Sequence, residues 1–226
     1  MKKLILFLLP VLALLSGCNR QNSVTYFGLE AGTVSAGVFT TDEGVKMTVV
    51  GNEDNFDVTT TRRVMVRYET HPITDFEKID IDVLAMMDAG IPVPTSVDVI
   101  SEDPDGTALQ VSDAWFSADY LNILATFSGK DPTLHTFSAV YKATEQGVTF
   151  RLSHDGTKDT ASGTLSCFLS IPVYDPMLSY ESQALASGLK NPWPAPVVLQ
   201  WTSTTLRSGP LTVSERKGSY TPPVSD

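Results

Sequence analysis

Alternation of apolar and polar side chains at every second position restricts the fold of this chain more than any other feature. In residues 63–71, Val64, Val66 and Tyr68 alternate with side chains of other kinds. Comparable runs cover residues 32–41, 45–51, 76–87, 108–116, 119–129, 134–143, 147–154, 162–171, 197–204 and 211–218. A period of two is typical of strands that bury one face, and turn residues separate the runs. The chain is therefore predicted to be all-β, with mainly antiparallel strands.

A proline-rich break divides these runs into two groups. The stretch "DAGIPVPT", residues 88–95, cannot lie in a central strand, and it predicts a boundary near residues 88–97. Residues 26–90 have the size of a small, strongly curved barrel, and residues 97–220 carry enough runs for an antiparallel β-sandwich. Residues 180–190 contain helix formers and end at Ser187-Gly188, so we expect one or two helical turns there. The topology of residues 172–196 stays open.

The N-terminal residues have the pattern of a lipoprotein signal. Lys2 and Lys3 precede an apolar run, residues 4–15, that is too short to span a bilayer as a helix. Leu15-Ser16-Gly17-Cys18 resembles the bacterial lipobox. This resemblance implies cleavage after residue 17 and lipidation of Cys18. Residues 1–17 are predicted as the signal peptide, and residues 18–25 as a linker.

The residues after Cys18 indicate the membrane in which the lipidated protein is expected to reside. Asn19 stands where an Asp would favour retention in the inner membrane, so we expect an outer-membrane lipoprotein of a diderm bacterium. Residues 19–22 have no acidic run of the kind that marks surface export, which favours the periplasmic side over the cell surface. With Cys18 lipidated, Cys167 has no disulfide partner. The alternation around Cys167 predicts a small apolar residue on a strand face.

Charge and motifs exclude several classes of function. The net charge is −10, and losing Lys2 and Lys3 takes it to −12, which disfavours nucleic-acid binding. The three histidines, His71, His135 and His154, show no spacing typical of a zinc site. Residues 101–112 resemble a calcium loop but lack its final Glu, so an Asp-Pro-Asp-Gly turn is the simpler interpretation. We expect no metal, no cofactor and no catalytic residue.

Two sets of residues keep glycan chemistry open as an alternative. Trp193, between two prolines, is the best candidate for an exposed aromatic ligand contact, although it could also plug the edge of the sandwich. Asp80 and Asp82 share one face of a strand, at a spacing that a glycosidase pair can have, although solvated carboxylates are the ordinary explanation. Trp115 is expected to fill the sandwich core.

Several stretches together resemble the NigD-like lipoproteins of Bacteroidota. The lipobox, the strand "RRVMVRYE" and the segment "VSDAWFSADYLNIL" carry this resemblance. The matching positions in the last segment are Trp115, Asp119, Tyr120, Leu121 and Asn122. The resemblance implies an N-terminal OB-like barrel followed by a C-terminal β-sandwich. The family takes its name from a bacteriocin-associated operon, and it supplies no catalytic residue to carry over.

The sequence therefore favours a non-enzymatic binding or accessory module held to the membrane by the lipid on Cys18. Its partner would be another envelope protein, a bacteriocin included, or a glycan. The alternative is a glycan-binding or glycan-hydrolysing lipoprotein, for which Asp80 and Asp82 would supply the carboxylates.

Cys18→Ser tests the anchor. A serine offers no thioether, so the variant is expected to lose lipid labelling and to leave the detergent phase in a detergent-partition experiment. If Cys18→Ser fractionates with membranes as the parent chain does, the lipoprotein interpretation is wrong.

Overall fold

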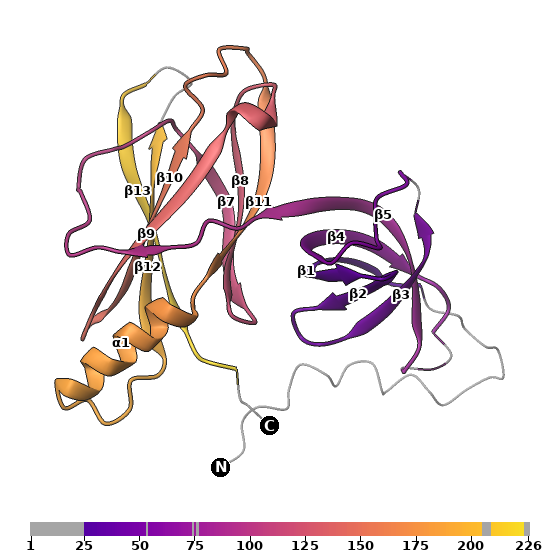
Figure 1. Ribbon diagram of the computed structural model, residues 1–226, viewed down its shortest axis with the longest axis horizontal. Helices are drawn as coiled ribbons and strands as arrows, with labels where there is room; N and C mark the ends of the chain where they lie inside the picture. Colours follow the sequence, from indigo (N-terminus) through magenta and orange to yellow (C-terminus); the bar gives the residue numbers. More distant parts are fainter. Residues whose placement is uncertain (1–24, 53, 74, 76, 205–208, 224–226) are drawn as a thin grey trace, which may run out of the picture.

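The computed structural model describes residues 25–52, 54–73, 75, 77–204 and 209–223. The signal peptide, Cys18 and most of the linker lie outside these residues. The described chain forms two β units that lie side by side, connected by one long strand (Figure 1). Strands make up most of both units, so the all-β prediction is confirmed.

The first unit is a closed five-stranded barrel. Its strands are β1 (Phe27–Ser35), β2 (Val38–Thr41), β3 (Lys46–Asn52), β4 (Arg62–Thr70) and β5 (Ile79–Gly90). The order β3-β2-β1-β4-β5 closes because β3 also pairs in parallel with β5. The alternating residues of β4 face inward as the sequence predicts. The barrel core contains Val34, Phe39, Met47, Val64, Val66, Tyr68, Ile81 and Val83.

One barrel run was interpreted wrongly as a single strand. Residues 32–41 contain a hairpin, in which β1 ends at Ser35 and β2 starts at Val38. Ala36 and Gly37 form the two-residue turn with φ values of 50° and 79°. Positive φ at both central residues is the geometry of a type I′ turn, which matches the twist of a hairpin. An alanine in this conformation gives little signal in the sequence.

The second unit is a sandwich of two sheets. Its elements are β6 (Thr95–Ser96), β7 (Gln110–Ser117), β8 (Tyr120–Ser128), β9 (Thr136–Thr144), β10 (Gly147–Asp155), β11 (Thr164–Pro172), β12 (Ala195–Thr204) and β13 (Leu211–Tyr220). One sheet has the order β5-β11-β8-β7 and the other β13-β12-β10-β9-β6. Most pairings are antiparallel, as expected, but β12 runs parallel to β10. The other sheet is mixed as well, because β5 runs parallel to β11. The barrel-and-sandwich fold class is therefore confirmed, with both sheets of the sandwich mixed.

A helix, α1 (Tyr174–Ala186), fills the connection that the sequence left open. It starts six residues before the expected segment, because Pro176 is accommodated in its first turn. It ends at the expected place. Gly188 has φ +94°, its N–H donates to the Leu185 carbonyl, and the Leu189 N–H donates to the Ala184 carbonyl. This is a Schellman cap, which confirms the predicted helix end.

Trp115 does not fill the sandwich core, contrary to expectation. The register of β7 against β8 shifts between Val111 and Asp113, and this bulge changes the face on which later side chains lie. Val111, Ala114 and Phe116 consequently pack against the core. Trp115 points the other way and stacks on Phe168, with 6.2 Å between ring centroids.

A polar network joins the barrel to the sandwich. Arg63 of β4 makes two parallel hydrogen bonds of 2.7 Å to Asp42, and both side chains are buried. The same guanidinium donates to Ser170 Oγ at 2.7 Å and to Asn122 Oδ1 at 2.8 Å. Burial would raise the pKa of Asp42, but hydrogen bonds from Arg63 and Ser117 lower it. The ion pair is therefore fully satisfied across the two units.

Apolar contacts surround this network. Ala31 and Met65 of the barrel form one buried cluster with Phe168 of the sandwich, and Trp115 and Leu124 pack against it. Strand β5 reaches into the same junction, where Ala89 and Gly90 pair with Phe168 and Leu169 of β11. The two units therefore share a sheet as well as an interface.

Arg63→Ala tests how much this junction stabilises the protein. The substitution leaves the Asp42 carboxylate buried without its cation, and we expect a loss of about 3–5 kcal/mol in the free energy of unfolding. Urea unfolding at 25 °C measures this loss. Arg67→Ala, at an exposed position of the same strand, is the matched control and should stay within about 0.5 kcal/mol of the parent. Equal effects of the two substitutions would contradict the assigned role of Arg63.

Candidate functional site

Two of the three histidines meet inside the sandwich. His135 lies just before β9 and His154 on β10, and their Nδ1 and Nε2 atoms are 2.9 Å apart. Both rings are buried and nearly parallel. The antiparallel register of β9 and β10 places His154 opposite Phe137, which brings residue 135 near it.

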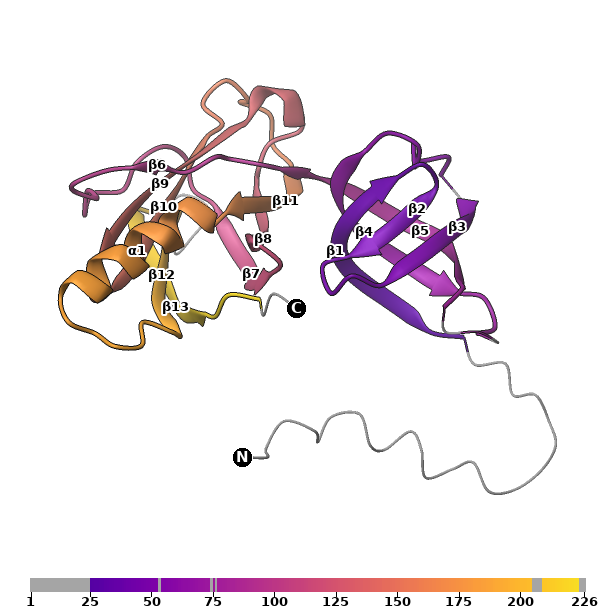
Figure 2. The same cartoon turned by 60° about the horizontal axis from the view of Figure 1, so that its bottom comes forward.

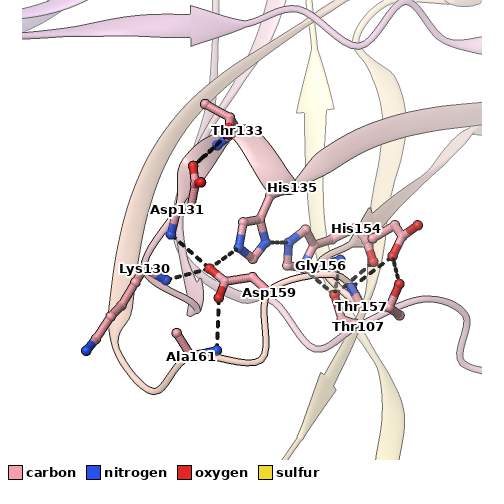
Figure 3. A network of polar contacts seen from close by, with 11 residues as sticks. Thr107, Lys130, Asp131, Thr133, His135, His154, Gly156, Thr157, Asp159 and Ala161 are labelled. Atoms are coloured by element: carbon pink, nitrogen blue, oxygen red, sulfur yellow. Dashed lines mark hydrogen bonds and ion pairs between the residues drawn. The ribbon is translucent and has the colours of Figure 1, made fainter.

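The histidine pair is the centre of a longer hydrogen-bonded chain (Figure 3). At one end, His135 Nε2 lies 3.2 Å from Asp159 Oδ2, and at the other, His154 Nδ1 lies 2.8 Å from Thr107 Oγ1. Asp159 also accepts hydrogen bonds from the backbone N–H groups of Asp131, Lys130 and Ala161. These three donors, with a smaller contribution from His135, hold the pKa of Asp159 well below its usual range.

Aromatic rings surround the imidazoles. Phe137 stacks on His154 with 4.9 Å between centroids, and Phe127 contacts both histidines. Burial in this apolar setting, together with the proximity of His135, lowers the pKa of His154. His154 is therefore neutral at neutral pH.

The order hydroxyl, imidazole, imidazole and carboxylate is one that a general-base relay can use. Here the hydroxyl end is occupied, because Thr107 Oγ1 accepts from the Gly156 N–H at 3.1 Å and contacts the His154 carbonyl oxygen at 3.1 Å. The carboxylate end is held by three backbone donors. We interpret this row of hydrogen bonds as a structural connection between the three loops that carry Thr107, His135 and Asp159 at one end of the sandwich. We call it the histidine clamp.

A hollow of about 650 Å³ lies beside this clamp. Its walls carry many hydroxyl groups, one side-chain amide and one carboxylate around aromatic side chains. They include Thr107, Gln110, Phe127, His154, Asp159, Trp201 and Ser214. Such a lining offers hydrogen-bond partners to a polar molecule.

Helix α1 presents a second candidate site at the other end of the sandwich. Met177, Tyr180 and Ala184 are buried in the sandwich core. Tyr174, Leu178 and Leu185 share one side of the helix next to this buried face, at a helical spacing, and all three are exposed. Leu189 follows the cap and is exposed too. We call Tyr174, Leu178, Leu185 and Leu189 the α1 stripe.

The structure places Trp193 under other side chains rather than free in solvent. Its ring makes edge contacts with Tyr180 at 5.8 Å and with Tyr220 at 6.0 Å, and the residue is half-buried. Its role as a ligand contact stays a prediction. Cys18, the predicted lipidation site, lies outside the described residues.

Of the two predicted carboxylates, Asp82 contacts a histidine, whereas the buried Oδ1 atom of Asp80 has no hydrogen-bond partner among the described residues. Asp82 accepts from His71 Nε2 at 3.0 Å on the barrel surface, and the Asp80 carbonyl accepts from the His71 N–H. Asp105 of the Asp-Pro-Asp-Gly turn pairs with the buried Arg151, which also reaches the Asp103 carbonyl. Asp103 and Asp105 thus fasten a loop over the sheet, as in the simpler interpretation.

Cys167 faces the sandwich core as predicted, and burial raises the pKa of its thiol to about 12. Among residues 25–223 that the structure describes, no group of His, Cys, Asp or Glu side chains is arranged to hold a metal ion. In the same part of the chain, no helix is long and apolar enough to cross a membrane.

Solved structures share this fold. A NigD-like immunity protein from Bacteroides caccae superposes with a TM-score of 0.60 at 19% identity, over 84% of this chain and 91% of that one. A protein of unknown function from Bacteroides vulgatus gives 0.59 at 16% identity, over 87% and 92%. A candidate lipoprotein from Bacteroides fragilis gives 0.55 at 14% identity, over 85% and 97%. No family model and no curated protein sequence matches the chain.

The structural matches confirm the NigD-like resemblance at the level of the fold. They do not extend to a ligand, because identities of this size show the fold alone. Sequence reasoning missed the histidine clamp and the α1 stripe. The sequence held one signal for each of them. For the clamp it was the hairpin register of His135 and His154, and for the stripe it was the helical spacing of Tyr174, Leu178 and Leu185.

His154→Gln tests the clamp through its pH dependence. The folded pKa of His154 lies below the ordinary 6.5, so the unfolded chain binds more protons and this group costs stability as the pH falls below about 6.5. We expect His154→Gln to lower stability by about 1–3 kcal/mol at pH 7 and to flatten the change between pH 7 and pH 5. Thermal unfolding across this range measures both effects.

Leu152→Val provides the control for destabilisation alone. It removes one buried methylene from the same strand and keeps both histidines, so its pH profile should follow the parent slope. A His154→Gln profile as steep as that of the parent would show that His154 does not titrate as assigned.

Proposed function

We propose that the chain is a lipid-anchored envelope protein that binds a partner protein through the α1 stripe and performs no catalysis. The observation that carries this proposal is the exposed apolar face of α1, on a helix whose other face is fixed in the core. Exposed apolar side chains that share one side of a rigid element are typical of protein interaction sites.

The flanking charges suggest the nature of the partner. Glu181 lies between Leu178 and Leu185 on the same side of the helix, Asp175 directly follows Tyr174, and the chain as a whole is strongly acidic. The complementary surface is therefore apolar with a basic rim. We propose another envelope protein, a bacteriocin included, because one protein with this fold is named an immunity protein.

The anchor and its location are part of the same proposal. The lipobox at Leu15-Ser16-Gly17-Cys18 supports a lipid on Cys18, and a candidate lipoprotein has the same fold. We propose the outer membrane, with the protein facing the periplasm. None of the three reported neighbours bears the name of an enzyme, which supports binding over catalysis.

Leu178→Glu with Leu185→Glu tests the stripe. The two carboxylates should abolish capture of a specific partner when the anchored protein is used to isolate binding proteins from its own envelope. Both positions face solvent, so the fold should be kept. Val93→Glu with Val99→Glu, at exposed positions outside α1, is the matched control and should retain the partner. If all forms capture the partner equally, the α1 stripe is not its binding site.

The hollow beside the histidine clamp favours glycan binding as a second candidate function. Its hydroxyl-rich lining and the Trp201 side chain support this alternative. A glycan array run beside the capture experiment distinguishes the sites. If glycan binding is lost in Gln110→Ala but kept in Trp193→Ala, the hollow is the glycan site. The reverse result would make Trp193 the glycan contact.

A further inference from the structure

The start of β1 carries the most exposed apolar side chains of the barrel. Phe27 is 71% exposed and Leu29 is 60% exposed, and Tyr26 directly precedes them with an exposed ring. Strand alternation places Phe27 and Leu29 on the outer face of the barrel, while Gly28 and Glu30 lie next to Tyr68 on the other side. Two large apolar side chains next to each other on one strand face form a continuous patch.

This patch continues an established interface. The next outward residue of β1 is Ala31, which is buried with Met65 and Phe168 at the junction with the sandwich. The sandwich therefore covers the outer face of β1 only as far as Ala31. Leu29 and Phe27 extend the same apolar row beyond the junction, towards the N-terminal end of the strand.

The chain that precedes the patch has a short and defined reach. Seven residues separate Cys18 from Tyr26, which makes eight steps along the chain, and a fully extended chain spans at most about 3.6 Å per step, or roughly 29 Å here. With the lipid on Cys18 inserted, the start of β1 stays close to the bilayer.

We propose that the outer face of β1 at Phe27 and Leu29 docks on the lipid bilayer beside the anchor. This inference rests on the proposed lipid anchor. The tether turns docking into an intramolecular step with a high effective concentration, so a small apolar patch is sufficient. Aromatic and leucine side chains are suited to the interfacial region of a bilayer.

The neighbouring charges indicate the kind of surface. Arg67 stands beside Leu29, and Glu69 stands beside Phe27, on the adjacent strand β4. One positive and one negative side chain flank the patch, within a chain of net charge −10. A zwitterionic lipid surface therefore fits better than a strongly anionic one, which would repel the protein.

Leu29→Trp gives a direct test in the lipidated mature chain. The variant is reconstituted in phosphatidylcholine vesicles, with and without lipids brominated in their acyl chains. We expect bromolipids to quench the added tryptophan. Val99→Trp, at an exposed position of the sandwich, is the matched control and should show no quenching beyond that of the parent.

A second measurement uses the mature chain that carries Cys18→Ser, so that only the patch can bind. Phe27→Ser with Leu29→Ser should lower its partition onto phosphatidylcholine vesicles about tenfold, since two exposed apolar side chains are lost. Val93→Ser with Val99→Ser, at positions 72% and 76% exposed, should leave partition unchanged.

The outcomes separate this inference from the anchor itself. Flotation of the parent chain with vesicles tests the anchor, and quenching at position 29 tests the patch. If the lipidated chain floats but Leu29→Trp is not quenched, docking is overturned and the anchor stands. A blue shift of Leu29→Trp that depends on protein concentration, without lipid, would show that a second copy covers β1 and would also overturn it.

Discussion

The buried ion pair between Arg63 and Asp42 is the constraint on which the arrangement of the two units depends. A guanidinium can be buried only if its donors are satisfied, and here the acceptors come from both units. Asp42 belongs to the barrel, whereas Asn122 and Ser170 belong to the sandwich. The guanidinium also lies 3.9 Å from the centre of the Tyr120 ring. A different orientation of the units would leave this charge unpaired.

This junction also explains the NigD-like resemblance in physical terms. The two resembling segments, "RRVMVRYE" and "VSDAWFSADYLNIL", are far apart in the sequence and meet at Arg63, Tyr120 and Asn122. Their contacts join the two units. Figure 2 shows α1 on the side of the sandwich that lies away from the barrel. The proposed lipid-facing patch and the proposed partner-facing stripe therefore belong to opposite parts of one joined body.

Period-two alternation predicted most strands and the faces of the core, because burial of one face leaves a direct trace in the sequence. On β11 it correctly placed Cys167 and Leu169 towards the sandwich core. It gave no information on what covers Phe168 and Ser170 on the other face, because that cover comes from a distant strand. The bulge that turns Trp115 outward and the pairing of His135 with His154 likewise depend on register. The alternation of side chains within one strand carries no information on how that strand is aligned with its neighbours.

The junction has a consequence for the order of events when the chain leaves the ribosome or crosses a membrane N-terminus first. All five barrel strands are available once residue 90 has emerged, so the barrel can close early. Ser170, however, follows Arg63 by 107 residues. Until Ser170 has emerged, the barrel exposes the Arg63–Asp42 pair together with Ala31 and Met65. The face of the barrel that contacts the sandwich is then still uncovered. The early barrel thus serves as the template on which β11 and the rest of the sandwich are completed.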